Sequence, residues 1–167
     1  QYRNIVSREG HAWVLASLDS DPQVVAAALA AEDAARQLDA RDTPSLLAYS
    51  DGSVIADGIE GSAAAVIRIG SVDVSATIRL AAADRALSSG RSEWAGLLLV
   101  QAILRRVRAD VTLRLDNLQV VNKFDDGEER FGNDWMRQNE RDMASLAWEM
   151  AAIRERRGLG SIKVLHQ

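Results

Sequence analysis

Three acidic residues stand where a strand ends or where a helix faces a core. Asp51 follows the apolar run 46–48, and such a run predicts a buried strand whose carboxylate emerges at its end. Asp116 follows a second alternating run at 111–115, and Glu93 lies at the start of a helical pattern. Carboxylate oxygens are hard ligands that suit Mg²⁺. If these three acids converge, they form a candidate metal site.

Each acid also has an ordinary structural explanation. An aspartate before Gly52 and Ser53 commonly forms a turn, and for Asp51 alone that is the more frequent case. Glu93 would lie in the first turn of its helix, where a carboxylate complements the helix dipole. The acidic stretch 125–129 lacks regular ligand spacing, so a solvated loop is the better interpretation. The chemical interpretation depends on all three acids meeting.

The elements that must position these acids begin with a meander. The first strand is expected to end at Asp51, and 54–61 is expected to be a loop that carries two glycines. Strands follow at 62–69 and 72–80, and the second alternates apolar with polar residues, which indicates a half-buried antiparallel strand. These segments predict three antiparallel strands in sequence order.

A helix then separates the meander from a fourth strand. From Arg91 the period becomes helical, and one stripe carries Glu93, Leu97, Val100 and Leu104. A helix between two strands of one sheet requires a crossover, so the strand 111–115 should lie parallel to and beside the first. Two parallel neighbours would then end in their acids at the same carboxyl edge, where ligands gather in open α/β sheets.

The remaining segments complete one α/β domain and a leader. A short helix is expected at 118–124, a long helix from the cap Asn133-Asp134 to Arg157, and a last strand at 161–166. Residues 1–43 are interpreted as a linker or the tail of a preceding domain with one packed helix. That helix would start at Asp21-Pro22, and its shallow apolar side would consist of Val25, Leu29 and Ala30, with Ala27 and Ala34.

Composition limits the possible classes of protein. The chain has 167 residues, no cysteine, a net charge of −4 and a pI of about 5.2. Disulfides and thiolate metal sites are therefore excluded, and no apolar run is long enough to cross a membrane. The negative charge argues against broad nucleic-acid binding by charge alone. An acidic cluster neutralised by divalent cations remains compatible with it.

The order of elements and three short segments resemble the type 1 ribonuclease H family, of the sort attached to retroelement reverse transcriptases. The segments are YSDGS around Asp51, SSGRSEWAGLLL around Glu93 and LRLDNLQVV around Asp116, with NDWMRQN around Trp135 as a fourth. The resemblance runs from about residue 46 to residue 166. It implies an α/β fold with a five-stranded mixed sheet, an antiparallel meander of the first three strands, and flanking helices.

The resemblance also implies a reaction and a set of residues. Two Mg²⁺ ions, for which Mn²⁺ can substitute, would bind Asp51, Glu93 and Asp116. Asp51 would bridge both ions, Glu93 would hold the ion near the leaving group, and Asp116 the ion that activates water. The chain would hydrolyse the RNA strand of RNA–DNA hybrids. Substrate contacts would come from Gly52, Ser53, Ser89, Gly90, Arg91 and Asn117, with Arg91 meeting a phosphate.

The same resemblance places the chain in a retroelement polyprotein, intracellular and without a membrane, next to a reverse transcriptase domain. The family has a fourth acid beyond the last strand, whereas the sequence printed here ends at His166-Gln167. Residues 44–167 are therefore expected to be a domain that lacks its C-terminal helix. Ser89 and Gly90 stand where the family often has asparagine, and no basic, tryptophan-rich protrusion is present.

Two other functions stay open at this point. A catalytically impaired ribonuclease H-like scaffold or interaction module would fit the missing fourth acid and the missing basic protrusion. A transposase or integrase core would share the fold, but its third acid usually lies on a late helix. The position of Glu93 on the first helix of the domain favours the ribonuclease H arrangement.

Overall fold

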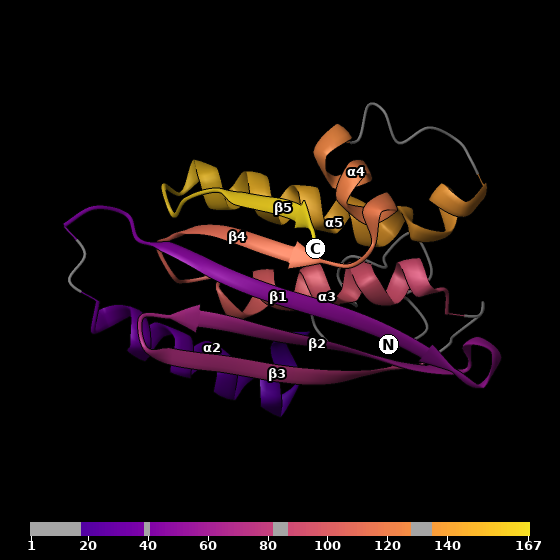
Figure 1. The fold of residues 1–167 in the computed structure, drawn as a ribbon, viewed down its shortest axis with the longest axis horizontal. Helices are drawn as coiled ribbons and strands as arrows, with labels where there is room; N and C mark the ends of the chain where they lie inside the picture. Colours follow the sequence, from indigo (N-terminus) through magenta and orange to yellow (C-terminus); the bar gives the residue numbers. More distant parts are fainter. Residues whose placement is uncertain (1–17, 39–40, 82–86, 128–134) are drawn as a thin grey trace.

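A computed structural model describes residues 18–38, 41–81, 87–127 and 135–167. Its centre is one five-stranded mixed sheet with the strand order β3-β2-β1-β4-β5 (Figure 1). The strands are β1 (Ser45–Ile55), β2 (Glu60–Ile69), β3 (Val72–Ala81), β4 (Asp110–Leu115) and β5 (Ile162–His166), and the helices are α2 (Pro22–Arg36), η2 (Ala56–Gly58), α3 (Ser89–Ile103), α4 (Leu118–Asp126) and α5 (Trp135–Arg156).

The sheet has the predicted meander and the predicted parallel crossover. β1 pairs antiparallel with β2, and β2 with β3, whereas β1 pairs parallel with β4. β5 adds a second parallel pair on the far side of β4. The last parallel partners of β1 and β4 are Tyr49 and Arg114, so Asp51 and Asp116 each stand two residues beyond the end of that pairing.

The expected end of the first strand at Asp51 is wrong. β1 continues to Ile55 because β2 remains alongside it, and the antiparallel register runs on to the pair Ile55 and Glu60. The expected loop 54–61 is accordingly the end of β1, the short helix η2 and the start of β2. Gly52 and Ser53 therefore lie inside a strand rather than at a turn.

The helix α3 is buried on every side. It packs on β1 and β2, while α2 and α5 also contact it (Figure 1). The predicted stripe Glu93, Leu97, Val100 and Leu104 is buried, and so is every other residue from Arg91 to Leu104. Because α3 is enclosed in this way, its buried residues are not confined to one face, and the predicted stripe is only part of its buried surface.

The helix α2 has the predicted cap, and its inner face matches the prediction only at Ala27 and Ala34. Asp21 is its N-cap, and the Oδ1 atom accepts the backbone N–H of Gln23 at 2.8 Å, with Pro22 at the first helical position. Val25 and Leu29 are exposed, contrary to prediction. The inner face of α2 lies in the same core as the sheet and consists of Val24, Ala27, Ala31 and Ala34. The assignment of residues 1–43 to a linker or a preceding domain stays a prediction.

The C-terminal helices follow the predicted order with shifted boundaries. α4 runs to Asp126, so the first two residues of the expected acidic loop are helical. The rest of that loop from 128 and the expected cap Asn133-Asp134 lie outside the described residues. On α5, Met143, Leu146 and Ala147 are buried. Within the described ranges, no helix combines the length and hydropathy that crossing a membrane requires.

Candidate active site

The strand β1 and the helix α3 bring Asp51 and Glu93 together. The backbone N–H of Gly52 donates to Glu93 Oε1 at 2.9 Å, and it also lies 3.0 Å from Oδ1 of Asp51. One peptide group of β1 therefore interacts with both carboxylates. The side chain of Asp51 is exposed, whereas Glu93 is only 6% exposed. The pair thus consists of one exposed carboxylate on the strand, Asp51, and one buried carboxylate on the helix, Glu93.

The contact between β1 and α3 requires a glycine at position 52. A Cβ atom added to Gly52 would lie 2.5 Å from the carbonyl oxygen of Ser92 and 2.6 Å from its Oγ atom. Real Cβ atoms do not approach backbone atoms so closely, so any side chain would push the strand and the helix apart. The glycine of the YSDGS segment thus sets the distance between Asp51 and Glu93, although it was predicted as a turn former and a substrate contact.

The carboxyl group of Glu93 is held in an environment that disfavours its charge. Burial is the largest cause, and together with the hydrogen bond and charge of Asp51 and the charge of Asp116 it raises the pKa of Glu93 from 4.5 to about 7, against the lowering effect of the Gly52 N–H. The second oxygen, Oε2, is buried and has no hydrogen-bond partner. An incompletely paired carboxylate in this position is a group for which a cation would be a favourable partner.

Asp116 reaches the same region from β4, as the parallel crossover predicted. Its side chain is 79% exposed, and its Oδ1 atom lies 3.6 Å from Nε2 of His166 at the end of β5. Asp51 and Asp116 line one open cavity of about 490 Å³, which also touches Tyr49 and Val66. Glu93 does not line this cavity, because it approaches β1 from the helical side of the sheet.

The donor set fits a hard cation, although the three acids are not arranged as a finished metal site. Among the described residues, no group of three or more His, Cys, Asp or Glu side chains stands close enough to hold a metal ion. The charges of Asp51 and Asp116 nevertheless act on Glu93, and Glu93 Oε2 has no other partner. Three carboxylates with an orphaned buried oxygen match the oxygen ligands that Mg²⁺ prefers.

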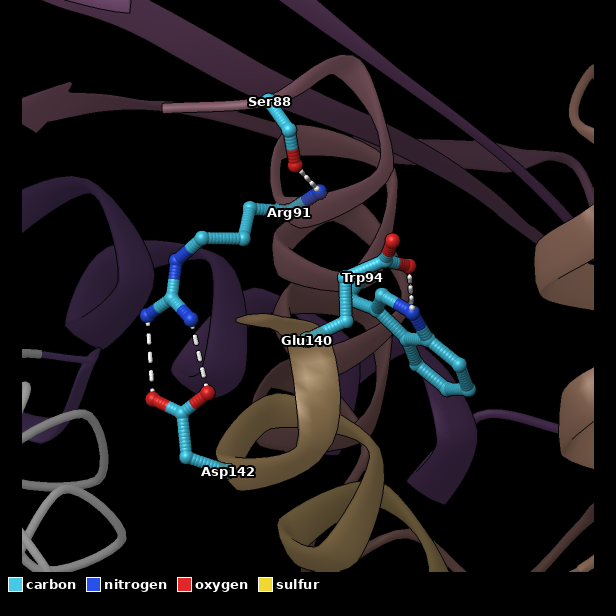
Figure 2. Close-up of polar contacts among 5 residues, drawn as sticks. All are labelled: Ser88, Arg91, Trp94, Glu140 and Asp142. Atoms are coloured by element: carbon cyan, nitrogen blue, oxygen red, sulfur yellow. Dashed lines mark hydrogen bonds and ion pairs between the residues drawn. The ribbon is translucent and has the colours of Figure 1, made fainter. Parts of the chain in front are cut away.

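The first turn of α3 is fixed by its own N-cap and by an ion pair with α5, both of which Figure 2 shows. Ser88 is the N-cap, and its Oγ atom accepts the backbone N–H of Arg91 at 3.0 Å. The guanidinium group of Arg91 donates to both oxygens of Asp142 at 2.7 and 3.0 Å. This bidentate geometry is the strongest form of an arginine–carboxylate pair, so it holds the helix that carries Glu93.

The predicted role of Arg91 is therefore corrected. A side chain that meets a substrate phosphate must reach solvent, but Arg91 is 7% exposed and its two terminal nitrogens are bound to Asp142 (Figure 2). The arginine in the segment SSGRSEWAGLLL supports the site from inside the protein. Its partner on α5 lies 51 residues away in sequence.

A second buried acid, Glu140, was not predicted. It is 4% exposed, its Oε1 atom accepts the indole N–H of Trp94 at 2.8 Å (Figure 2), and Lys123 Nζ lies 3.8 Å from the same oxygen. A Cβ atom on Gly90 would lie 2.7 Å from the Glu140 carboxylate. Gly90 thus leaves space for this acid. The sequence held no signal for it beyond one glutamate in a polar helix.

The other predicted substrate contacts, Ser53, Ser89 and Asn117, lie in different environments. Ser89 and Ser53 are exposed, at the start of α3 and on β1 respectively, and both remain available for a ligand. Asn117 directly follows Asp116 and caps α4, since its Oδ1 atom accepts the backbone N–H of Val120 at 3.1 Å. The side-chain oxygen of Asn117 is therefore already hydrogen-bonded, and only the side-chain N–H groups are left for a substrate. No observation tests these three contacts.

Comparison with known proteins identifies the fold. No family model and no curated protein matches the sequence. The chain is similar to RNase H1 from the halophilic archaeon Halobacterium salinarum, with 17% identity over 74% of this chain and 85% of that one and a TM-score of 0.53. LC11-RNase H1 in complex with an RNA/DNA hybrid gives 12% identity over 73% and 84%, also with a TM-score of 0.53.

A viral structure shows the same likeness. The foamy viral protease-reverse transcriptase in complex with dsDNA matches at 12% identity over 73% of this chain and 80% of that one, with a TM-score of 0.53. The chain thus has the α/β ribonuclease H-like fold, with a five-stranded sheet in the order 3-2-1-4-5 and flanking helices. This fold is shared by type 1 ribonuclease H domains, and identities this low concern the fold alone.

Proposed function

We propose that this chain is a Mg²⁺-dependent endonuclease that hydrolyses the RNA strand of RNA–DNA hybrids. The observation that supports it most is the bond from the Gly52 N–H to Glu93, which holds a buried carboxylate beside Asp51 on a strand whose parallel neighbour delivers Asp116. The fold alone would not justify an activity. Asp51 and Asp116, which come from two other elements, both raise the pKa of Glu93, and this makes the proposal more specific than the fold does.

In this proposal Asp51, Glu93 and Asp116 hold two divalent cations, usually Mg²⁺ and in its place Mn²⁺. The ions would stabilise the attacking and leaving oxygens of an in-line phosphodiester displacement. The Gly52 N–H orients Glu93 through Oε1, which leaves Oε2 free for a ligand. Ser53, Ser89 and the amide of Asn117 would supply neutral donors for contact with sugar and phosphate oxygens.

The proposed partner is an RNA–DNA hybrid, together with a neighbouring reverse transcriptase domain in a retroelement polyprotein. One structural neighbour was determined with an RNA/DNA hybrid, and another is a viral protease-reverse transcriptase. The net charge of −4 supplies little general attraction for nucleic acid. A neighbouring domain would supply the attraction for nucleic acid that the net charge of this chain does not.

The second candidate is a catalytically impaired ribonuclease H-like scaffold. It is favoured by the absence, within the described ranges, of any ready-made cluster of three metal-binding side chains. The exposed Asp116, whose Oδ1 atom lies 3.6 Å from His166 Nε2, also fits it. The two candidates differ in one property, which is hydrolysis that depends on Mg²⁺.

The test is cleavage of an RNA–DNA hybrid labelled on the RNA strand, with Mg²⁺ and with EDTA. Asp51→Asn and Glu93→Gln keep the size of each side chain and remove a charge, so both should abolish cleavage in a folded protein. Glu155→Gln removes an exposed charge near the end of α5 and is the matched control. Activity of Asp51→Asn equal to the parent would exclude the metal site, and a folded but inactive parent would favour the scaffold.

A further inference from the structure

A buried polar cluster connects three helices behind the candidate active site. This Trp94 cluster consists of Trp94 on α3, Lys123 on α4 and Glu140 on α5. Glu140 Oε1 accepts the indole N–H of Trp94 at 2.8 Å (Figure 2), and Lys123 Nζ lies 3.8 Å from the same oxygen. Trp94 is fully buried, and the side chains of Lys123 and Glu140 are 11% and 5% exposed. One carboxylate oxygen therefore links α4 to α3.

A second series of contacts links the same two helices through α5. The indole N–H of Trp148 on α5 donates to the carbonyl oxygen of Phe124 on α4 at 3.3 Å. The rings of Trp148 and Trp94 meet edge to face, with their centroids 6.4 Å apart and their planes at 80°. Such aromatic pairs are favourable beyond the apolar area that they bury. Two consecutive residues of α4, Lys123 and Phe124, are thus connected to the one indole ring of Trp94.

The helices linked in this way adjoin two of the three candidate metal ligands. Trp94 directly follows Glu93 on α3, and Asp116 directly precedes Asn117, which is the N-cap of α4. The parallel pairing of β4 with β1 ends two residues before Asp116. The position of the Asp116 carboxylate therefore depends on where α4 begins as well as on β4. A movement of α4 relative to α3 would change the separation between Glu93 and Asp116.

The buried charges of the Trp94 cluster indicate more than a contribution to stability. Charged side chains lose hydration on burial, and apolar side chains of similar size often stabilise a protein equally well or better. A charged pair does favour one arrangement of the helices that it joins, because other arrangements would leave a buried charge without a partner. Lys123 and Glu140 thus have the properties of a contact that fixes α4 relative to α3.

We propose that the Trp94 cluster positions two candidate metal ligands relative to each other. It sets the separation between Glu93 and Asp116, and its own three residues act only through them. The proposal rests on the proposed function, in which these two carboxylates and Asp51 hold common cations. Mg²⁺ requires nearly ideal octahedral geometry at short distances, so its binding is sensitive to a shift of one ligand. Changes to residues that orient metal ligands typically cost about 10- to 100-fold in metal affinity or activity.

The test uses the double variant Lys123→Met/Glu140→Gln, which removes both charges and nearly preserves the size of both side chains. Its glutamine keeps an oxygen that can accept the indole N–H of Trp94. We expect a urea midpoint close to that of the parent but about tenfold more Mg²⁺ for half-maximal cleavage of the RNA–DNA hybrid. The control is Arg36→Met/Asp33→Asn, which removes an exposed ion pair of α2 and should keep the Mg²⁺ requirement of the parent.

A second readout needs neither cations nor cleavage. The backbone amide NMR signals of Asn117 and Leu118 should shift in the double variant and not in the control, because the start of α4 moves relative to α3. Unchanged signals at both residues would overturn the positioning role. A lower urea midpoint with an unchanged Mg²⁺ requirement would also overturn it, because the cluster would then serve stability only. A parent that cleaves no hybrid would contradict the proposed function instead, and the amide signals would still test the positioning role.

Discussion

The backbone N–H of Gly52 donates to Glu93 Oε1 at 2.9 Å, across 41 residues of sequence. This bond joins the strand that carries Asp51 to the helix that carries Glu93, and it leaves the second oxygen of Glu93 buried without a partner. The candidate site is therefore organised before any ligand arrives. Its properties depend on the close approach of β1 and α3.

A side chain at position 52 should break that approach. In Gly52→Ala the Cβ atom would lie 2.5 Å from the Ser92 carbonyl oxygen, and overpacking of this kind costs about 1–3 kcal/mol. We expect a lower free energy of unfolding in urea and loss of Mg²⁺-dependent cleavage in the folded fraction. Ser75→Ala, at an exposed position on β3, is the control. Full activity in Gly52→Ala would refute the assigned packing role.

The raised pKa of Glu93 predicts a pH dependence of stability without divalent cations. The folded protein binds this proton more tightly than the unfolded chain, since burial and Asp51 raise the pKa from 4.5 to about 7. The contribution is complete below about pH 4.5 and is lost as the pH rises through about 7. The free energy of unfolding should fall over that interval in the parent, and less in Glu93→Gln. Equal slopes in both proteins would contradict the assignment.

The ion pair between Arg91 and Asp142 should contribute far more to the free energy of unfolding than an exposed ion pair does. Its side chains are 8% and 22% exposed, and removing one partner of a buried pair costs about 3–5 kcal/mol. Asp142→Asn should therefore lower the urea midpoint strongly. The matched control is the pair Arg36–Asp33, whose side chains are 70% and 64% exposed and where a single substitution should cost at most about 1 kcal/mol. Similar losses at both pairs would argue against the supporting role of Arg91.

Gly90 and Glu140 compete for one space, which predicts that their substitutions are coupled. Gly90→Ala places a Cβ atom 2.7 Å from the Glu140 carboxylate, so it should destabilise the parent by about 1–3 kcal/mol. In the Glu140→Ala background the same change should cost much less. A double-mutant cycle from urea unfolding measures this difference. Additive effects would show that the two residues do not share the space.

Much of the fold could be predicted from the sequence. The alternation of apolar and polar residues marks the strands, and the crossover rule then makes the fourth strand parallel to the first. The positions of Asp51 and Asp116 beyond a parallel pair followed from the order of elements. The end of β1 was misjudged because Gly52-Ser53 is also a turn signal, and only the pairing with β2 keeps the strand going to Ile55. The inner face of α2 was predicted only in part, at Ala27 and Ala34, because small residues such as Ala31, rather than Leu29, allow close packing.

The support around the site could not be predicted. Glu140 is buried and Asp142 is half-buried on α5, and nothing in the local sequence distinguishes either carboxylate from the other polar residues of that helix. Their partners Arg91 and Trp94 are 51 and 46 residues away. Burial of a charged group depends on tertiary pairing, which a pattern along one segment does not encode.

The most direct test of the account is paramagnetic broadening of backbone amide NMR signals by low concentrations of Mn²⁺. If Asp51, Glu93 and Asp116 hold common cations, the signals of Gly52, Glu93 and Asn117 should broaden first, and Asp51→Asn or excess Mg²⁺ should restore them. The signal of Glu155, near the end of α5, should stay sharp. Broadening that spares the three acids, or that persists unchanged in Asp51→Asn, would contradict a shared cation site.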